Sequence, residues 1–129
     1  MSSREFTASR AMIQFCTYCD ENYLPRALAL LESLERHAPP FQLWVLCLTE
    51  ECHDLVRRLN PPNVQPVALR ALEAWDQRLA AVKTSRSVAE YYFTLSPCWP
   101  RYVLAHDPGI EWLTYLDSDL CFYASPALI

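Results

Sequence analysis

Short apolar runs alternate with amphipathic helical patterns along this chain of 129 residues, and this alternation most constrains its fold. Apolar, β-prone runs predict four strands, at residues 12–18, 42–48, 64–69 and 112–116. Helical spacing of apolar residues predicts helices at residues 23–37, 50–60, 71–82, 85–95 and 100–106. This order predicts an α/β fold in one domain, residues 1–129, with a mostly parallel sheet covered by helices on both faces.

Single residues predict details of this fold. Thr49 is expected to cap the helix that begins at residue 50. Pro66 cannot donate a ladder hydrogen bond, so the third strand is expected at an edge of the sheet. A further short strand is expected at residues 121–123. The run Tyr91-Tyr92-Phe93 and the four tryptophans are expected mainly in packing roles, and the three histidines at helix ends or on the surface.

Glycine is nearly absent, because Gly109 is the single glycine of the chain. Glycine-rich phosphate loops and dinucleotide fingerprints are therefore excluded, and a phosphate would need a metal, arginines or a helix N-terminus. The net charge of −4 gives no electrostatic attraction to nucleic acids or anionic membranes. Without a transmembrane run or an apolar signal core in the first ten residues, a cytoplasmic protein is expected.

Six cysteines lie mostly among apolar neighbours and are expected to be reduced and buried. The Cys16-x-x-Cys19 pair leaves a zinc site open as an alternative. That site would need Cys47 and Cys52, whose spacing is at the edge of the usual range.

Two carboxylates, Asp117 and Asp119, follow the fourth predicted strand, where ligands of parallel sheets bind. On an extended chain they would point the same way and repel each other. A divalent cation, Mg²⁺ or Mn²⁺, would relieve that repulsion and could neutralise a diphosphate. The alternative is a pair of capping or solvated loop aspartates.

A second polar cluster, Asp20-Glu21-Asn22-Tyr23, follows the first strand. Short polar side chains and an aromatic ring suit a nucleoside, but an Asx turn that caps the next helix explains them equally. In a third segment, Lys83 and Arg86 flank a predicted helix start at Thr84 or Ser85. They could hold a diphosphate or be a solvated basic helix start.

Three segments together resemble a known family: FCTYCDENYLPRALALLESL, residues 41–48, and LTYLDSDLCFYAS. They look like the N-terminal, Rossmann-like half of nucleotide-diphospho-sugar transferases, and most like family 8-type glycosyltransferases of the GT-A fold. The resemblance implies that Asp20 and Asn22 bind the uracil and ribose of a UDP-sugar, and that Tyr23 stacks on the base.

The same resemblance implies a metal-binding pair, Asp117 and Asp119, with Asp117 also near the ribose and Ser118 near the donor. It further implies that a basic residue before the last strand, Lys83 or Arg86, contacts the donor. The expected function is metal-dependent transfer of a sugar from the nucleotide to an acceptor hydroxyl.

Other functions stay open. A phosphatase of the haloacid dehalogenase type also uses Asp-x-Asp, but Leu120 and Cys121 follow here where glycine and threonine are expected. The chain could instead be a non-catalytic nucleotide-binding or interaction domain, or an inactive fragment. Because it stops soon after Asp119, we expect it to be part of a longer protein. Strand 112–116 would then be an uncovered apolar edge prone to self-association.

Overall fold

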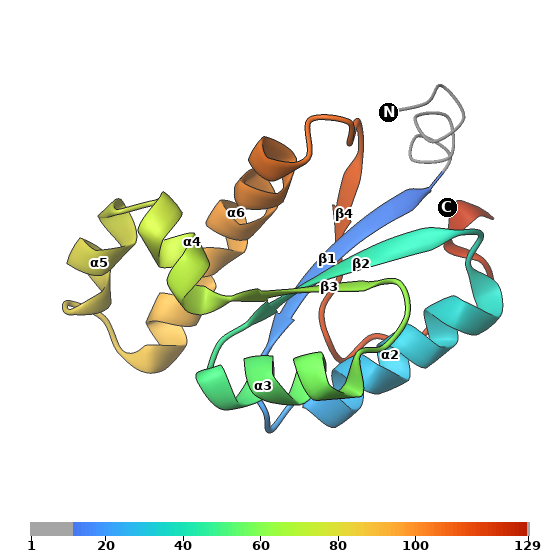
Figure 1. Cartoon of the computed structure of the whole chain (residues 1–129), viewed down its shortest axis with the longest axis horizontal. Helices are drawn as coiled ribbons and strands as arrows, with labels where there is room; N and C mark the ends of the chain where they lie inside the picture. Colours follow the sequence, from blue (N-terminus) through green and yellow to red (C-terminus); the bar gives the residue numbers. More distant parts are fainter. Residues whose placement is uncertain (1–11, 129) are drawn as a thin grey trace.

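Four parallel strands form the centre of the computed structural model, which describes residues 12–128 (Figure 1). They are β1 (Ile13–Cys19), β2 (Phe41–Cys47), β3 (Val64–Ala68) and β4 (Leu113–Tyr115). The spatial order is β3-β2-β1-β4, so the chain builds to one side of β1 and then returns to the other. The four expected strands are confirmed, and Pro66 lies on an edge strand as predicted.

Helices cover both faces of this sheet, which confirms the α/β fold (Figure 1). One face carries α2 (Leu24–His37) and α3 (Glu50–Leu59). The other carries α4 (Leu69–Trp75), α5 (Arg78–Lys83) and α6 (Val88–His106). A short 3₁₀ turn, η1, spans Pro126–Leu128. Across residues 12–128, no helix has both the length and the apolar character needed to span a membrane.

The sheet separates two apolar cores, as the alternation of β1 shows. Phe15 and Cys19 pack with α2 and α3, whereas Cys16 packs with α6 on the opposite face. Trp99 of α6 is fully buried, and its indole N–H donates to the carbonyl of Thr17 at 2.9 Å. This bond ties the longest helix to the central strand next to the strand's carboxyl end.

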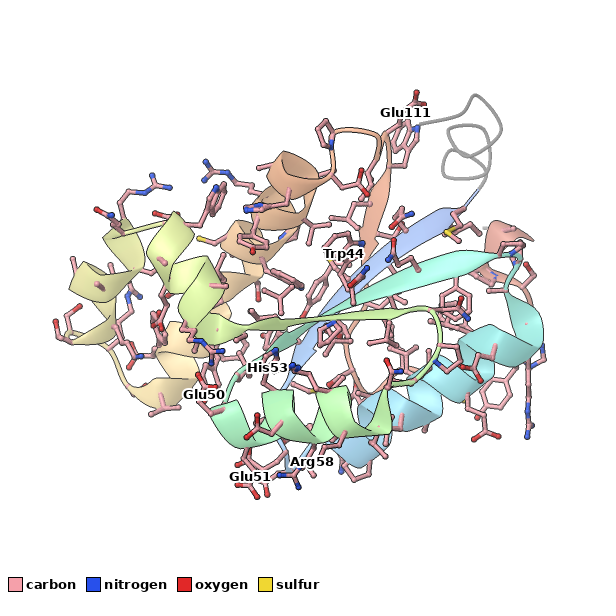
Figure 2. The ribbon with its side chains drawn as sticks, in the orientation of Figure 1. Trp44, Glu50, Glu51, His53, Arg58 and Glu111 are labelled. Atoms are coloured by element: carbon pink, nitrogen blue, oxygen red, sulfur yellow. The ribbon has the colours of Figure 1, made fainter. Side chains whose placement is uncertain are left out.

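The α3 helix begins as the sequence predicts. The backbone N–H of Cys52 donates to the hydroxyl of Thr49 at 3.1 Å, so Thr49 caps the helix. In Figure 2, Glu51 and Arg58 lie on the outer side of α3, whereas His53 points toward the sheet. His53 was expected at a helix end or on the surface; it lies near the start of α3 and is buried, so the surface alternative is wrong.

Helix boundaries on the other face differ from the prediction. The single helix expected at residues 71–82 is two helices, because the carboxylate of Asp76 accepts the backbone N–H of Arg78 and ends the first one in a turn. The hydroxyls of Thr84 and Ser85 donate to carbonyls of α5, so neither caps the next helix. Ser87 caps it instead, in a capping box with Glu90.

Two expected helices in this region are one, α6, which contains Pro97 and Pro100. Leu95, Trp99 and Val103 follow one another at four-residue spacing and are all fully buried. The burial of these three side chains stabilises α6 as one continuous helix, although each proline lacks the backbone N–H that would donate a helical hydrogen bond.

No strand forms at residues 121–123, contrary to the prediction. The chain turns away from the sheet, and the backbone N–H of Phe122 donates to the hydroxyl of Ser33 on α2 at 2.9 Å. Ser33 is buried, and Phe122 packs against the α2 core. Trp112, expected as a core or partly buried anchor, is instead 85% exposed beside the edge strand β4.

Candidate functional site

A cleft of about 710 Å³ opens at the carboxyl ends of β1 and β4. These are the two strands between which the strand order reverses, and ligands of parallel sheets bind at such a point. The lining residues come from both strand ends and from α6: Tyr18, Cys19, Asp20, Tyr23, Leu48, Val88, Ala89, Tyr92, Phe93, Tyr115, Asp117, Ser118 and Asp119.

Asp20 organises the turn that follows β1. Its Oδ1 atom accepts the backbone N–H groups of Asn22 and Tyr23, each at 3.0 Å. This is the Asx turn weighed from the sequence, and it caps the start of α2 in place of a side chain from Tyr23. In the part of the chain that the structure describes, no side chain bonds to the second carboxylate oxygen of Asp20, Oδ2. Asp20 can therefore cap the helix with one oxygen and face a ligand with the other.

Aromatic and apolar side chains form the walls of the cleft. Tyr23 is 48% exposed, and the guanidinium of Arg26 lies 5.2 Å from its ring centroid. Phe93 is 74% exposed on α6, and Tyr92 beside it is partly buried. Exposed rings facing a cleft can hold a flat ligand such as a nucleobase by stacking.

Asp117, Ser118 and Asp119 lie in a turn and not on extended chain, which corrects the sequence prediction. The backbone N–H of Leu120 donates to the carbonyl of Asp117 at 3.1 Å and closes this turn. Both carboxylates still line the cleft, where the pair was expected. The chain bends because Phe122 must reach Ser33 on the α2 face.

Two tyrosines, Tyr18 and Tyr115, line the cleft together with Asp117. Their ring centroids are 5.9 Å apart, and the hydroxyl of Ser96 on α6 donates to the Tyr18 hydroxyl at 3.3 Å. Burial, and then Tyr18 and Asp117, hold the pKa of Tyr115 far above its usual value. Tyr115 therefore stays protonated, and its neutral hydroxyl can donate a hydrogen bond to the Asp117 carboxylate.

The cleft is acidic. Three carboxylates, from Asp20, Asp117 and Asp119, are among its lining residues, and neither lysine nor arginine is among them. Burial, and then the negative charges of Asp20 and Glu21, raise the pKa of Tyr92. A phosphate ligand would be repelled from this surface unless a cation entered with it.

The two carboxylates of the β4 turn suit such a cation, since hard oxygen ligands are typical of Mg²⁺ and Mn²⁺. Among residues 12–128, no group of three or more His, Cys, Asp or Glu side chains is arranged to hold a metal ion. Mg²⁺ commonly binds through one or two carboxylates and takes its other ligands from water and phosphate. The aspartate pair fits that mode of binding, in which the nucleotide completes the coordination.

Three of the predicted site residues do not line the cleft. Asn22 is exposed and contributes its backbone N–H to the Asx turn. Lys83 pairs with Glu73 at 2.9 Å and lies 5.5 Å from the ring centroid of Tyr91. Arg86 is exposed in the segment between α5 and α6. Asp20, Tyr23, Asp117, Ser118 and Asp119 are the predicted residues that the fold brings together.

The zinc alternative for the Cys16-x-x-Cys19 pair does not fit the fold. An odd spacing on a strand places Cys16 and Cys19 on opposite faces of the sheet, in different cores. Cys19 lies instead beside Cys52, with 3.9 Å between the sulfurs.

Sequence reasoning named neither Tyr18 nor Tyr115 as a cleft residue, and it favoured packing over cleft-lining roles for Tyr92 and Phe93. A signal for two of them was present, because successive helical residues point in directions about 100° apart. Tyr91, Tyr92 and Phe93 therefore cannot share one face of α6, and only Tyr91 is buried in the core. The tyrosines of β1 and β4 carry no such signal, because their meeting depends on strand order.

Comparisons with known proteins give two relatives, both from Bacillus subtilis (strain 168). The chain is 34% identical over 115 residues to the "Uncharacterized protein YfnF" and 29% identical over 115 residues to the "Uncharacterized protein YfnD". Each match covers 89% of this chain, but only 37% of YfnF and 36% of YfnD. The chain thus spans little more than a third of these relatives. No family model matches it, and no solved structure matches it significantly.

Proposed function

We propose that this chain is the Rossmann-like, nucleotide-binding half of a metal-dependent glycosyltransferase with a GT-A fold, and that its cleft binds a UDP-sugar. One observation carries the proposal: the aspartate pair after β4 and the Asp20 turn after β1 line one acidic cleft. These two segments carry the family resemblance, and they are more than ninety positions apart in the sequence.

In the proposed complex, the nucleoside lies against the β1 turn. Tyr23 stacks on the base, and the second carboxylate oxygen of Asp20 accepts a hydrogen bond from the base or the ribose. The apolar surface of Phe93 and Tyr92 forms the opposite wall. A neutral, partly aromatic nucleoside is compatible with this acidic surface in a way that a bare diphosphate is not.

Asp117 and Asp119 would hold Mn²⁺ or Mg²⁺ next to the diphosphate. When bound, the cation neutralises the diphosphate and stabilises the charge that builds up on it as the sugar leaves. In the proposed complex, the protonated Tyr115 hydroxyl donates to the Asp117 carboxylate and orients it. Ser118 lies between the two aspartates and can donate a hydrogen bond to the donor. Transfer to an acceptor hydroxyl is the proposed reaction.

Calorimetric titration with UDP, in Mn²⁺ and then in chelator, tests this proposal on the wild type and on Asp119→Ala. We expect binding that needs the metal and that weakens by roughly a hundredfold in the variant, about 2.7 kcal/mol. Asp54→Ala is the matched control, since Asp54 is exposed on α3 outside the cleft. Equal UDP binding with and without metal, or by Asp119→Ala and the wild type, would contradict the proposal.

A non-catalytic domain of the same architecture is the second candidate. It is favoured by the acidic lining of the cleft, which includes neither lysine nor arginine to bind a diphosphate. UDP binding without hydrolysis or transfer of a UDP-sugar by this chain would support it.

A further inference from the structure

Three thiols meet beneath the cleft, at the point where β1 and β2 end and α3 begins. Cys19 and Cys47 are the last residues of their strands and are paired in the parallel register. Cys52 lies in the first turn of α3 and belongs to the same buried core cluster as Cys19 and Cys47. All three are free and are at most 2% exposed. The proposed sugar transfer uses none of them.

Within this group, Cys19 and Cys52 form the closest pair. Their sulfurs are 3.9 Å apart, and the Cys52 thiol also donates to the backbone carbonyl of Cys19 at 3.5 Å. A disulfide needs about 2.05 Å between the sulfurs, so the two atoms must approach by less than about 2 Å. Cys47 instead directs its thiol to the carbonyl of Val45 at 3.8 Å.

Position also distinguishes the two partners. Cys19 is among the residues that line the cleft, and it is 2% exposed. Interaction with Cys19, and then with Cys47, lowers the pKa of Cys52. Cys52 also lies in the first turn of α3, and a helix N-terminus favours a thiolate. The bonds to Cys52 and burial raise the pKa of Cys19 and Cys47.

We propose that Cys19 and Cys52 form a reversible disulfide when the protein meets hydrogen peroxide, and that this modification site tethers α3 to the floor of the cleft. One sulfur, as its thiolate, attacks one oxygen of the peroxide and breaks the O–O bond, which gives a sulfenic acid. The hydroxide that leaves takes up the proton that the thiol lost and becomes water. The second sulfur displaces the hydroxyl group, which leaves as water, and the S–S bond forms. The two sulfurs lose two electrons to the peroxide oxygens, and both thiol protons end in water.

The cross-link would close a loop that contains all of α2 and β2. It would also fix the residue directly before Asp20 to the start of α3, where Thr49 already donates to the carboxylate of Glu21. Oxidation should therefore stabilise the fold, with a rise in Tm of about 5 to 10 °C. This inference does not depend on what the cleft binds.

Peptide mapping after treatment with hydrogen peroxide tests the proposal. The full chain would carry Cys98→Ser and Cys121→Ser, which remove the two least buried thiols. Remaining thiols are alkylated in denaturant, and the chain is digested without reductant. Cleavage after Tyr18 separates Cys16 from Cys19, and cleavage after Glu50 or Glu51 separates Cys47 from Cys52.

We expect one cross-linked pair of peptides, carrying Cys19 and Cys52, that reductant separates and that accompanies the higher Tm. Cys47→Ala should keep the cross-link, whereas Cys52→Ala or Cys19→Ala should abolish it. If Cys19→Ala or Cys52→Ala fails to fold, the other variant and the peptide map of the chain with Cys98→Ser and Cys121→Ser still test the cross-link. A link through Cys16 or Cys47, an unlinked sulfinic acid, or four unmodified thiols after peroxide would overturn the proposal.

Discussion

The turn after β1 is held by local hydrogen bonds, whereas the turn after β4 depends on contact with a distant helix. Asp20 binds two backbone N–H groups within three residues and caps α2. Asp117 and Asp119 lie in a turn whose continuation is anchored by Phe122 on Ser33, 89 positions away. Both turns present carboxylates to the same cleft, but one carboxylate is partly used for folding and the other pair is not. Because its carboxylates are not used to cap a helix, the aspartate pair after β4 is the better candidate for binding a cation.

The largest expected effect is on Mn²⁺ affinity, which should depend on the turn after β4 and not on the turn after β1. Asp117→Asn should weaken Mn²⁺ binding in the presence of UDP by roughly a hundredfold, because it removes one of two anionic ligands. Asp20→Asn keeps an oxygen for the Asx turn and should change Mn²⁺ affinity by less than about threefold. Titration of Mn²⁺ by electron paramagnetic resonance measures both. Equal losses in the two variants would mean that both turns hold the metal.

Removing the anchor of the β4 turn should have the next largest effect. Ser33→Ala deletes the acceptor of the Phe122 N–H and should destabilise the fold by about 1 to 2 kcal/mol. Amide hydrogen exchange should rise at residues 117–125 and stay unchanged at residues 20–23. Thr94→Ala is the control, because its hydroxyl bonds within α6 only. Unchanged protection of residues 117–125 would show that this turn is stable without the hydrogen bond to Ser33.

Loss of the local cap should be smaller and should fall on the other turn. Asp20→Ala should lower the free energy of unfolding by about 1 kcal/mol, as loss of a helix cap usually does. Asp119→Ala should leave it within about 0.5 kcal/mol, because Asp119 is exposed and makes no hydrogen bond that supports the turn. Urea denaturation measures both values. A larger loss for Asp119→Ala would reverse the comparison.

The smallest effect concerns pH and the link between the β1 turn and α3. The Thr49 hydroxyl donates to the Glu21 carboxylate and lowers the pKa of Glu21 below its ordinary value of 4.5. The folded state then binds fewer protons than the unfolded state, so this stabilisation is present above pH 4.5 and is lost as the pH falls through the folded value.

Glu21→Gln should therefore reduce the loss of stability on acidification below pH 4.5, and Thr49→Ser, which keeps the hydroxyl, should not. Denaturant curves taken at several pH values measure this difference. An unchanged pH dependence in Glu21→Gln would show that the bond to Thr49 contributes nothing to the stability of the β1 turn.

Several features of this protein follow from the sequence alone. Buried parallel strands are continuous apolar runs, so all four were predicted, and Pro66 predicted the edge. Thr49 and Asp20 each accept a hydrogen bond from a backbone N–H three residues away. Both the cap of α3 and the Asx turn can therefore be predicted from the local sequence. Ligands of parallel sheets bind at the carboxyl ends of the strands. The polar residues and the tyrosine that follow two of the predicted strands, Asp20, Tyr23 and Asp117–Asp119, were therefore predicted as site residues.

Only the tertiary structure decided which of these residues meet. The cleft exists because β4 pairs with β1 and not with β3, and strand order does not follow from local patterns. That pairing brings the ring of Tyr18 beside the ring of Tyr115. It also places Cys19 beside Cys52 and separates it from Cys16. The bend after Asp117 and the continuity of α6 through two prolines likewise result from burial against distant residues, because packing outweighs local preference when a side chain reaches the core.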